Sequence, residues 1–240
     1  DFQNRDISSS EPYGTAYKPR GDYNESFVTI RQDKYDLFVG ANKEFGDFNV
    51  DVLLGGTQYK TRTESKGGGG NDLVVPFVSS VTNVAAPSFS YGFSALGINS
   101  VFGSANVGFK NYLFLNVTGR QDQFSTLSPA NNTLFYPSVG LSFILSDAVK
   151  LPDAISFGKL RASWAQVGGG GPDPYQLLLA YGLVGVGHLG GTLGTISNGA
   201  IPNQNLQPFT STEFEVGADF RFLKNRLGID IAYYNRKTTN

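Results

Sequence analysis

The segment Glu213–Phe222, with the sequence EFEVGADFRF, alternates apolar and polar positions without a break. Its even-numbered residues are Phe214, Val216, Ala218, Phe220 and Phe222, whereas its odd-numbered residues are charged or Gly. A two-residue period is that of a β-strand, in which successive side chains point to opposite faces. A second alternating run starts at Arg226. The intervening Lys224-Asn225 predicts a two-residue hairpin link, because Asn accepts a positive φ.

The same unit recurs upstream, where Phe109-Lys110-Asn111 again precedes an alternating run. Extending this pattern along the chain predicts eight strands that pair antiparallel in sequence order, near residues 33–45, 48–62, 98–109, 112–123, 134–146, 158–167, 208–223 and 226–237. One residue of each strand is expected to lie on a shared outward face: Leu37, Val52, Val107, Leu115, Leu141, Trp164, Phe220 and Ile229. Segments rich in Gly, Pro, Ser and Asn predict long loops near 63–96, 123–134 and 167–207.

Composition excludes several classes of protein. The 240 residues include 19 basic and 20 acidic side chains and no Cys. This balance argues against a basic nucleic-acid-binding domain, and the lack of Cys excludes disulfide scaffolds and cysteine zinc sites. His188, the only His, lies in a Gly-rich stretch, and no catalytic constellation accompanies it. We therefore expect no enzyme activity, no metal site and no cofactor.

Alternation alone fits both a soluble sandwich and a membrane barrel, because both need one apolar face. Three features favour the barrel. The strands are long, the links between them are short on one rim and long on the other, and aromatic residues gather at the short links. The sequence therefore predicts an all-β fold, a segment of an antiparallel up-and-down transmembrane β-barrel. The alternative is a soluble or surface β-rich module that binds glycans or acts in adhesion.

Four segments together resemble SusC/RagA-type TonB-dependent outer-membrane transporters. They are GKLRASWAQVG at Gly158–Gly168, PNQNLQPFTSTEFEVG at Pro202–Gly217, DFRFLKNRL at Asp219–Leu227 with Tyr233-Tyr234 after it, and YPSVGLS at Tyr136–Ser142. Phe143 stands where that family more often has Trp. The resemblance runs through most of the chain from Phe102 onward, and it is specific in the combination of motifs.

The resemblance implies that residues 1–240 are part of one barrel domain, about eight strands of a ~22-stranded barrel, with the plug and the terminal strands outside this sequence. It further implies a place in the bacterial outer membrane and import of a bulky nutrient, either an oligosaccharide or a peptide. The implied partners are a SusD-like lipoprotein lid, TonB acting through the plug, outer-membrane lipid and the rest of the barrel.

Candidate substrate contacts are aromatic residues of the expected long loops and polar residues of the inward face. The aromatic candidates are Phe89, Tyr91, Tyr175 and Tyr181, and the polar candidates are Arg161 and Glu215. Exposed aromatic rings stack on sugar faces or hold peptide side chains. The alternative for the aromatic residues is structural: they pack the loops against one another or against the lipoprotein lid.

Overall fold

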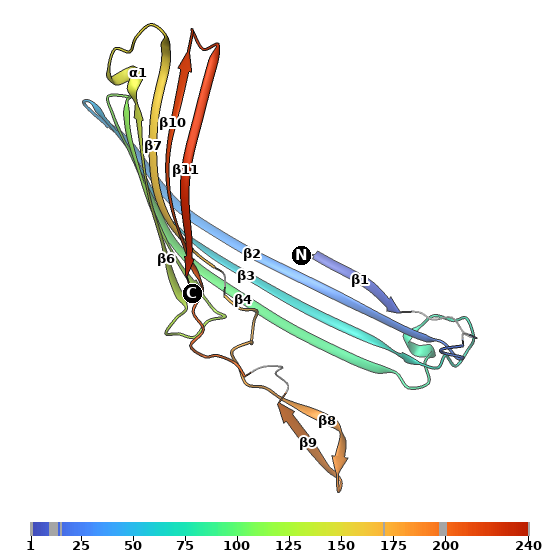
Figure 1. The fold of residues 1–240 in the computed structure, drawn as a ribbon. Helices are drawn as coiled ribbons and strands as arrows, with labels where there is room; N and C mark the ends of the chain where they lie inside the picture. The colour runs from blue at the N-terminus through green and yellow to red at the C-terminus, as the bar shows by residue number, and fades with distance from the viewer. Residues whose placement is uncertain (1, 10–13, 15, 170, 197–200, 240) are drawn as a thin grey trace. The chain divides into compact units, whose positions relative to one another are not determined.

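The computed structural model describes all residues except 1, 10–13, 15, 170, 197–200 and 240. Nine strands form one antiparallel sheet in the order β1-β2-β3-β4-β5-β6-β7-β10-β11, and β8 and β9 form a separate hairpin (Figure 1). The strands are β1 (Phe2–Ser9), β2 (Asp22–Phe45), β3 (Phe48–Asn71), β4 (Ser88–Phe109), β5 (Leu113–Phe124), β6 (Thr133–Ile144), β7 (Ile155–Gly168), β8 (Tyr181–His188), β9 (Gly191–Ile196), β10 (Thr210–Phe222) and β11 (Leu227–Thr239).

Helical structure in the described residues is limited to a 3-10 turn, η1 (Val81–Asn83), and the four-residue α1 (Leu145–Ala148). Neither is long and apolar enough to cross a membrane. The chain divides into a larger unit, residues 35–58 and 98–240, and a smaller unit, residues 1–34 and 59–97. Each unit is described separately below.

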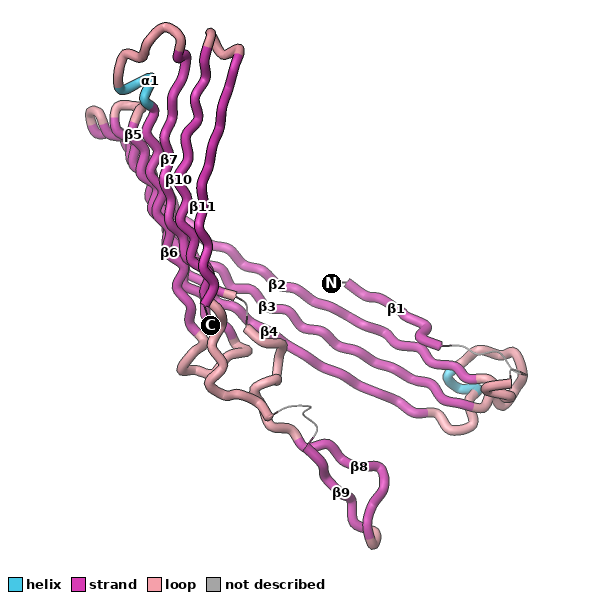
Figure 2. Tube along the Cα trace, viewed as in Figure 1, coloured by secondary structure: helices cyan, strands magenta, loops and turns pink. Residues whose placement is uncertain are grey.

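In the larger unit, β5, β6, β7, β10 and β11 run side by side (Figure 2). Their registers bring the apolar residues of neighbouring strands together, because Val107 pairs with Leu115 and Leu115 pairs with Leu141. Trp164 pairs with Phe214, and Phe220 pairs with Ile229, on the same face. On β3, Leu54 faces Gly103 of β4 on the apolar side, and Val52, two residues away, lies on the same face. Gly40 of β2 faces Leu53 on the polar side, which places Leu37, an odd number of residues from Gly40, on the apolar face too. The predicted shared face is confirmed.

This apolar face is bare in the described part of the chain. Leu37, Val101 and Ile231 keep 81%, 61% and 66% of their surface exposed, although burial would be favourable for each in water. A soluble sandwich would cover such a face with a second sheet, and the described strands supply only the small β8-β9 hairpin besides the main sheet. The arrangement is the one that a lipid-facing barrel wall requires.

Aromatic rings form a continuous row at the short-turn ends of β3 to β6. The ring centroids of Phe48 and Phe109 are 4.7 Å apart, those of Phe109 and Tyr112 are 5.6 Å apart, and those of Tyr112 and Phe143 are 5.8 Å apart. Lys110 places its ammonium 5.3 Å from the Phe109 ring centroid. Rings with an apolar body and a polar surround suit the boundary between lipid and water.

The short turns obtain their geometry from residues in the left-handed region. In the β4-β5 turn, Lys110 and Asn111 have φ values of 46° and 60°, as a type I′ hairpin requires. The β10-β11 link is longer than the two residues expected: it runs from residue 223 to 226, and Leu223, Lys224 and Asn225 all have positive φ. The backbone N–H of Arg226 closes this turn by donating to the Phe222 carbonyl at 3.1 Å.

In the smaller unit, the expected loop near 63–96 is mostly strand, because β3 continues to Asn71 and β4 starts at Ser88. The run Gly67–Gly70 belongs to β3, and it is glycine because neighbouring strands approach closely. A Cβ at position 69 would lie 2.3 Å from the Tyr23 carbonyl oxygen. Only residues 72–87 connect the two strands.

That connection folds onto a small core in which Leu73 bridges to Val84 and both pack with Tyr23. The Asn83 side chain holds the connection together: its amide donates to the carbonyls of Val75 at 2.8 Å and Val78 at 2.7 Å, and its oxygen accepts from the Val75 N–H at 2.9 Å. Phe77 lies at the tip with a φ of 64° and is 79% exposed.

The other two expected loops are partly different from the prediction. The β5-β6 connection, residues 125–132, agrees with the loop expected near 123–134. The loop expected near 167–207 instead contains the β8-β9 hairpin, in which Tyr181 pairs with Ile196. The strand β1 was also not expected; it pairs with β2 from Phe2↔Ile30 onward.

Candidate functional site

The polar face of the larger unit carries a charge network centred on Arg161. This residue lies on β7, and its guanidinium reaches across β10 to β11. Arg161 Nε is 3.3 Å from Glu215 Oε1, and Arg161 Nη2 is 3.0 Å from Asp230 Oδ1. Gly217, the register partner of Arg161 on β10, leaves room for the guanidinium, since a Cβ there would lie 2.6 Å from Arg161 Nε.

The structure thus brings together the two polar residues proposed from the sequence, Arg161 and Glu215. A second pair lies further along the same strands, where Arg236 Nε is 2.6 Å from Glu213 Oε2. Carboxylates and guanidinium groups therefore neutralise one another along this face. The side chains of Arg161 and Glu215 remain 31% and 33% exposed, so they stay in contact with water and with any solute beside the wall.

Phe89 and Tyr91 lie on β4 in the smaller unit, and the prediction that they occupy a loop is wrong. The two side chains share one side of the strand with Phe93, and Phe89 and Tyr91 are 77% and 65% exposed. The Arg62 guanidinium of β3 lies 5.7 Å from the Phe93 ring centroid on that side. Aromatic and cationic groups therefore line a strand surface here rather than a loop tip.

Tyr175 lies in the segment between β7 and β8, and Tyr181 is the first residue of β8. Tyr175 has a φ of 67°, a conformation uncommon for a residue with a large side chain. It lines a cavity of about 360 Å³ together with Leu177, Leu178 and residues 125–129 of the β5-β6 connection. Tyr181 is 72% exposed on the hairpin.

A further cavity was not expected from the sequence and lies where the ladder between β6 and β7 ends. The pairing of these strands runs from Ile144↔Lys159 to Ser138↔Ala165 and no further in the described residues. Both strands nevertheless continue, β6 to Thr133 and β7 to Gly168. The ladder stops beside Pro137, which has no N–H to donate. We call the resulting opening, between residues 133–137 of β6 and 166–168 of β7, the rim notch.

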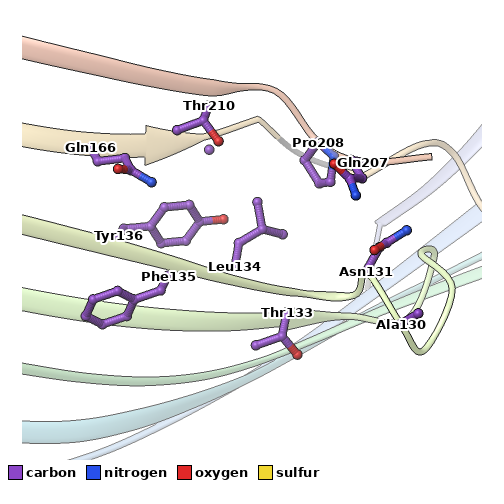
Figure 3. Close-up of a pocket in the computed structure, with 11 residues that line it drawn as sticks. Ala130, Asn131, Thr133, Leu134, Phe135, Tyr136, Gln166, Gln207, Pro208 and Thr210 are labelled. Atoms are coloured by element: carbon purple, nitrogen blue, oxygen red, sulfur yellow. The ribbon is translucent and has the colours of Figure 1, made fainter. Parts of the chain in front are cut away.

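The rim notch encloses about 300 Å³. Its lining residues are Ala130, Asn131, Thr133, Leu134, Phe135, Tyr136, Gln166, Gly168, Gln207, Pro208 and Thr210. Figure 3 shows Tyr136 and Leu134 below the strand that carries Gln166, with Pro208 and Gln207 to the upper right of Leu134. Gly168 permits this approach, because a Cβ there would lie 2.8 Å from the Tyr136 ring and 2.7 Å from Leu134. Pro137 within an alternating run was the sequence signal for the notch.

The described residues contain no group of three or more His, Asp or Glu side chains arranged around a common point. The arrangement offers hydrogen bonding, aromatic stacking and paired charges along a wall. Such a surface can bind and guide a solute.

Comparison with known proteins agrees with this reading of the wall. The profile of the family described as TonB dependent receptor-like, beta-barrel matches residues 1–240. Among curated proteins, TonB-dependent receptor P3 of Formosa agariphila is 29% identical over 84% of this chain, and TonB-dependent receptor P26 of the same organism is 27% identical over 99%. The matched regions are 21% and 25% of those two proteins, so this chain spans a quarter or less of the length of these relatives.

Among solved structures, the chain is similar to the RagAB peptide transporter, with a TM-score of 0.83 at 17% identity over 98% of this chain and 27% of the other. The 'open-open' state of the RagAB peptide importer gives a TM-score of 0.80. At this level of identity the likeness concerns the fold. The chain therefore belongs to the TonB dependent receptor-like β-barrel family, whose members are receptors and transporters of the bacterial outer membrane rather than enzymes.

Proposed function

We propose that this chain forms part of the barrel wall of a transporter that imports a bulky nutrient, an oligosaccharide or a peptide, in a TonB-dependent manner. The observation that carries the proposal is the two-faced sheet. One face exposes apolar side chains such as Leu141 and Ile231, and the other carries the network around Arg161. A sheet with this division suits a wall between lipid and an aqueous path.

The substrate contacts that we propose lie on the polar face and on the long connections. Arg161 and Glu215 line the path, and Phe89, Tyr91, Tyr175 and Tyr181 supply aromatic surfaces for the incoming solute. Exposed rings bind both sugar faces and peptide side chains, so these residues fit either substrate class. The cavity lined by Tyr175 and the β5-β6 connection supports the choice of Tyr175 as a substrate contact.

The partners in this proposal follow from the mode of import. Residues 1–240 form one wall segment within a single barrel domain, and energy from TonB reaches the barrel through a plug. A SusD-like lipoprotein covers the outer rim, where the β5-β6 and β7-β10 connections of the larger unit lie. The similarity in fold to the RagAB peptide transporter supports a paired arrangement of this kind.

The proposal is tested by uptake in cells that carry the full-length transporter. Replacing Tyr175 and Tyr181 together by Ala is expected to weaken substrate binding by roughly 1–3 kcal/mol if either ring is a central anchor. Uptake at low substrate concentration falls accordingly, whereas barrel assembly, followed by heat-modifiable migration in gels, stays normal. Deleting tonB is expected to abolish uptake in the wild-type strain.

The matched control is Tyr233→Ala, an exposed tyrosine on the apolar face of β11. This variant leaves the solute path untouched, so its uptake should equal that of the wild type at equal amounts of assembled barrel. Normal uptake by the Tyr175/Tyr181 double variant would assign those rings to packing or lid contacts. Uptake that persists without TonB would refute the transport mode itself.

A further inference from the structure

The rim notch differs from the Arg161 network in the chemistry of its lining. Its polar side chains are three amides, Asn131, Gln166 and Gln207, and three hydroxyls, Thr133, Tyr136 and Thr210. Each of these groups both donates and accepts hydrogen bonds, and none is charged. The volume of about 300 Å³ is at the lower end of the ~300–1,000 Å³ typical of pockets for small ligands.

The charges nearest to the notch in the register are already engaged. On β5, Arg120 is the pairing partner of Tyr136, and Asp122 is that of Leu134. Arg120 Nε is 2.8 Å from Asp122 Oδ1, and its Nη2 donates to Ser100 Oγ at 2.9 Å. A charged ligand group in the notch would therefore lose hydration without gaining an opposite charge, which is costly.

The notch is lined by two aromatic residues, Phe135 and Tyr136, and Tyr136 is the one whose ring approaches β7. Its ring lies beside Gly168 and Leu134 and borders the cavity. A flat ring combined with neutral groups that both donate and accept matches a sugar, which has an apolar ring face and a rim of hydroxyls. Pro137 makes the notch less suitable for an added peptide strand, because the β6 edge lacks a backbone donor at that position.

We propose that the rim notch is a saccharide subsite that binds one unit of a neutral oligosaccharide, with Tyr136 as the stacking platform and Gln166 as a hydrogen-bonding partner. The proposal rests on the transport function proposed above and narrows its substrate class. Because the notch lies next to the β5-β6 and β7-β10 connections, it would contact the oligosaccharide at the rim, before the solute reaches the Arg161 network.

The test uses the purified full-length transporter in detergent and two probes: a partial acid hydrolysate of mixed neutral polysaccharides, and a tryptic digest of casein. Bound molecules are identified by native mass spectrometry, and affinities are measured by calorimetry with the recovered species. We expect the wild type to retain neutral oligosaccharides. Tyr136→Ala should weaken their binding roughly tenfold, and Gln166→Ala about 2- to 10-fold.

Two controls separate recognition from folding. Tyr136→Phe keeps the ring and loses only the hydroxyl, so its loss of affinity should be smaller than that of Tyr136→Ala. Gln58→Ala removes an exposed glutamine from β3, a strand that contributes no residue to the notch lining. That variant should bind like the wild type. All variants are compared at equal heat-modifiable, folded protein.

The proposal is overturned if the wild type retains no neutral oligosaccharide, or if Tyr136→Ala and Gln166→Ala bind it as the wild type does. It is also overturned if both variants lose peptide binding instead. These results are distinguishable from failure of the transport function, which is judged separately by whether wild-type uptake requires TonB. TonB-dependent peptide uptake would leave the transport function standing and refute the saccharide subsite.

Discussion

Single residues with positive φ determine how this wall turns at its short rim. Lys110 and Lys224 occupy equivalent places, each following a bulky apolar residue and preceding Asn, and both adopt φ values near those of a left-handed helix, 46° and 55°. A side chain with a Cβ pays roughly 1–2 kcal/mol for this conformation, whereas Gly does not. Both lysines therefore adopt this conformation at a cost in free energy, and the contact of Lys110 with the Phe109 ring offsets part of that cost.

Replacing Lys224 by Gly is therefore expected to stabilise the barrel by about 1 kcal/mol, because Gly adopts the positive φ of this position without the steric cost that a Cβ brings. The measurement is the urea midpoint of the full-length protein folded in micelles. Lys237→Gly is the control: this lysine lies in extended β11, so glycine there should lower stability by roughly 0.5–1 kcal/mol. An unchanged or lower midpoint for Lys224→Gly would show that the turn stores no strain.

At the scale of elements, the strands of the larger unit are predictable because one face is apolar and the other polar. Glu213–Phe222 is the clearest case, and its predicted bounds differ from those of β10 by only a few residues. In the smaller unit, β3 lacks that contrast: between Lys60 and Lys66 it has charges on one side and Thr or Ser on the other. The pairing of this part of β3 depends on backbone hydrogen bonds and on close packing at glycines, and neither produces an alternation of apolar and polar residues in the sequence.

The candidate site shows the same limit. The place of Arg161 and Glu215 on one polar face was predictable, because both residues lie in strands with a clear two-residue alternation. Phe89 and Tyr91 were assigned to a loop because Gly67–Gly70 resembles a flexible linker in sequence. The rim notch depends on where the ladder between β6 and β7 ends, and on side chains such as Gln207 that are distant in sequence. Neither the end of that ladder nor the approach of those distant side chains follows from the alternation of apolar and polar residues.

The β3-β4 connection offers a prediction at this scale. Asn83→Ala removes three hydrogen bonds from a mostly buried side chain, and each is worth about 0.5–1.5 kcal/mol. The connection should then open locally, and chymotrypsin should cut after Phe77 at least several times faster in the full-length protein. Asn205→Ala, at an exposed asparagine, is the control and should leave cleavage at Phe77 unchanged. Equal rates for both variants would contradict the holding role of Asn83.

At the scale of the whole molecule, the free energy of assembly depends on which face of the wall meets lipid. Phe220 and Asp219 are adjacent in sequence and lie on opposite faces, since Phe220 pairs with Ile229 and Asp219 pairs with Asp230. The β2, β3 and β4 strands have 24, 24 and 22 residues, at least twice the ~9–11 that cross a bilayer. A large part of each strand therefore has to be stable in water.

Phe220→Arg places a charge on the lipid face and should destabilise the assembled barrel by about 2–4 kcal/mol near the midplane. The readout is the fraction of heat-modifiable barrel in outer-membrane preparations. Asp219→Arg is the matched control, because position 219 faces the polar side and should tolerate the charge far better. Equal assembly of both variants would mean that lipid does not contact the apolar face.

The connection between β7 and β10 has a consequence for how the protein meets the outside of a cell. Between Arg161 and Arg221 the sequence contains neither Lys nor Arg, yet it holds the hairpin with Tyr181 and Leu189 exposed by 72% and 95%. Trypsin has no cleavage site in this stretch, whereas chymotrypsin has several on accessible backbone. A loop of this kind resists trypsin without being buried, and shaving intact cells with the two proteases in turn would reveal which rim it occupies.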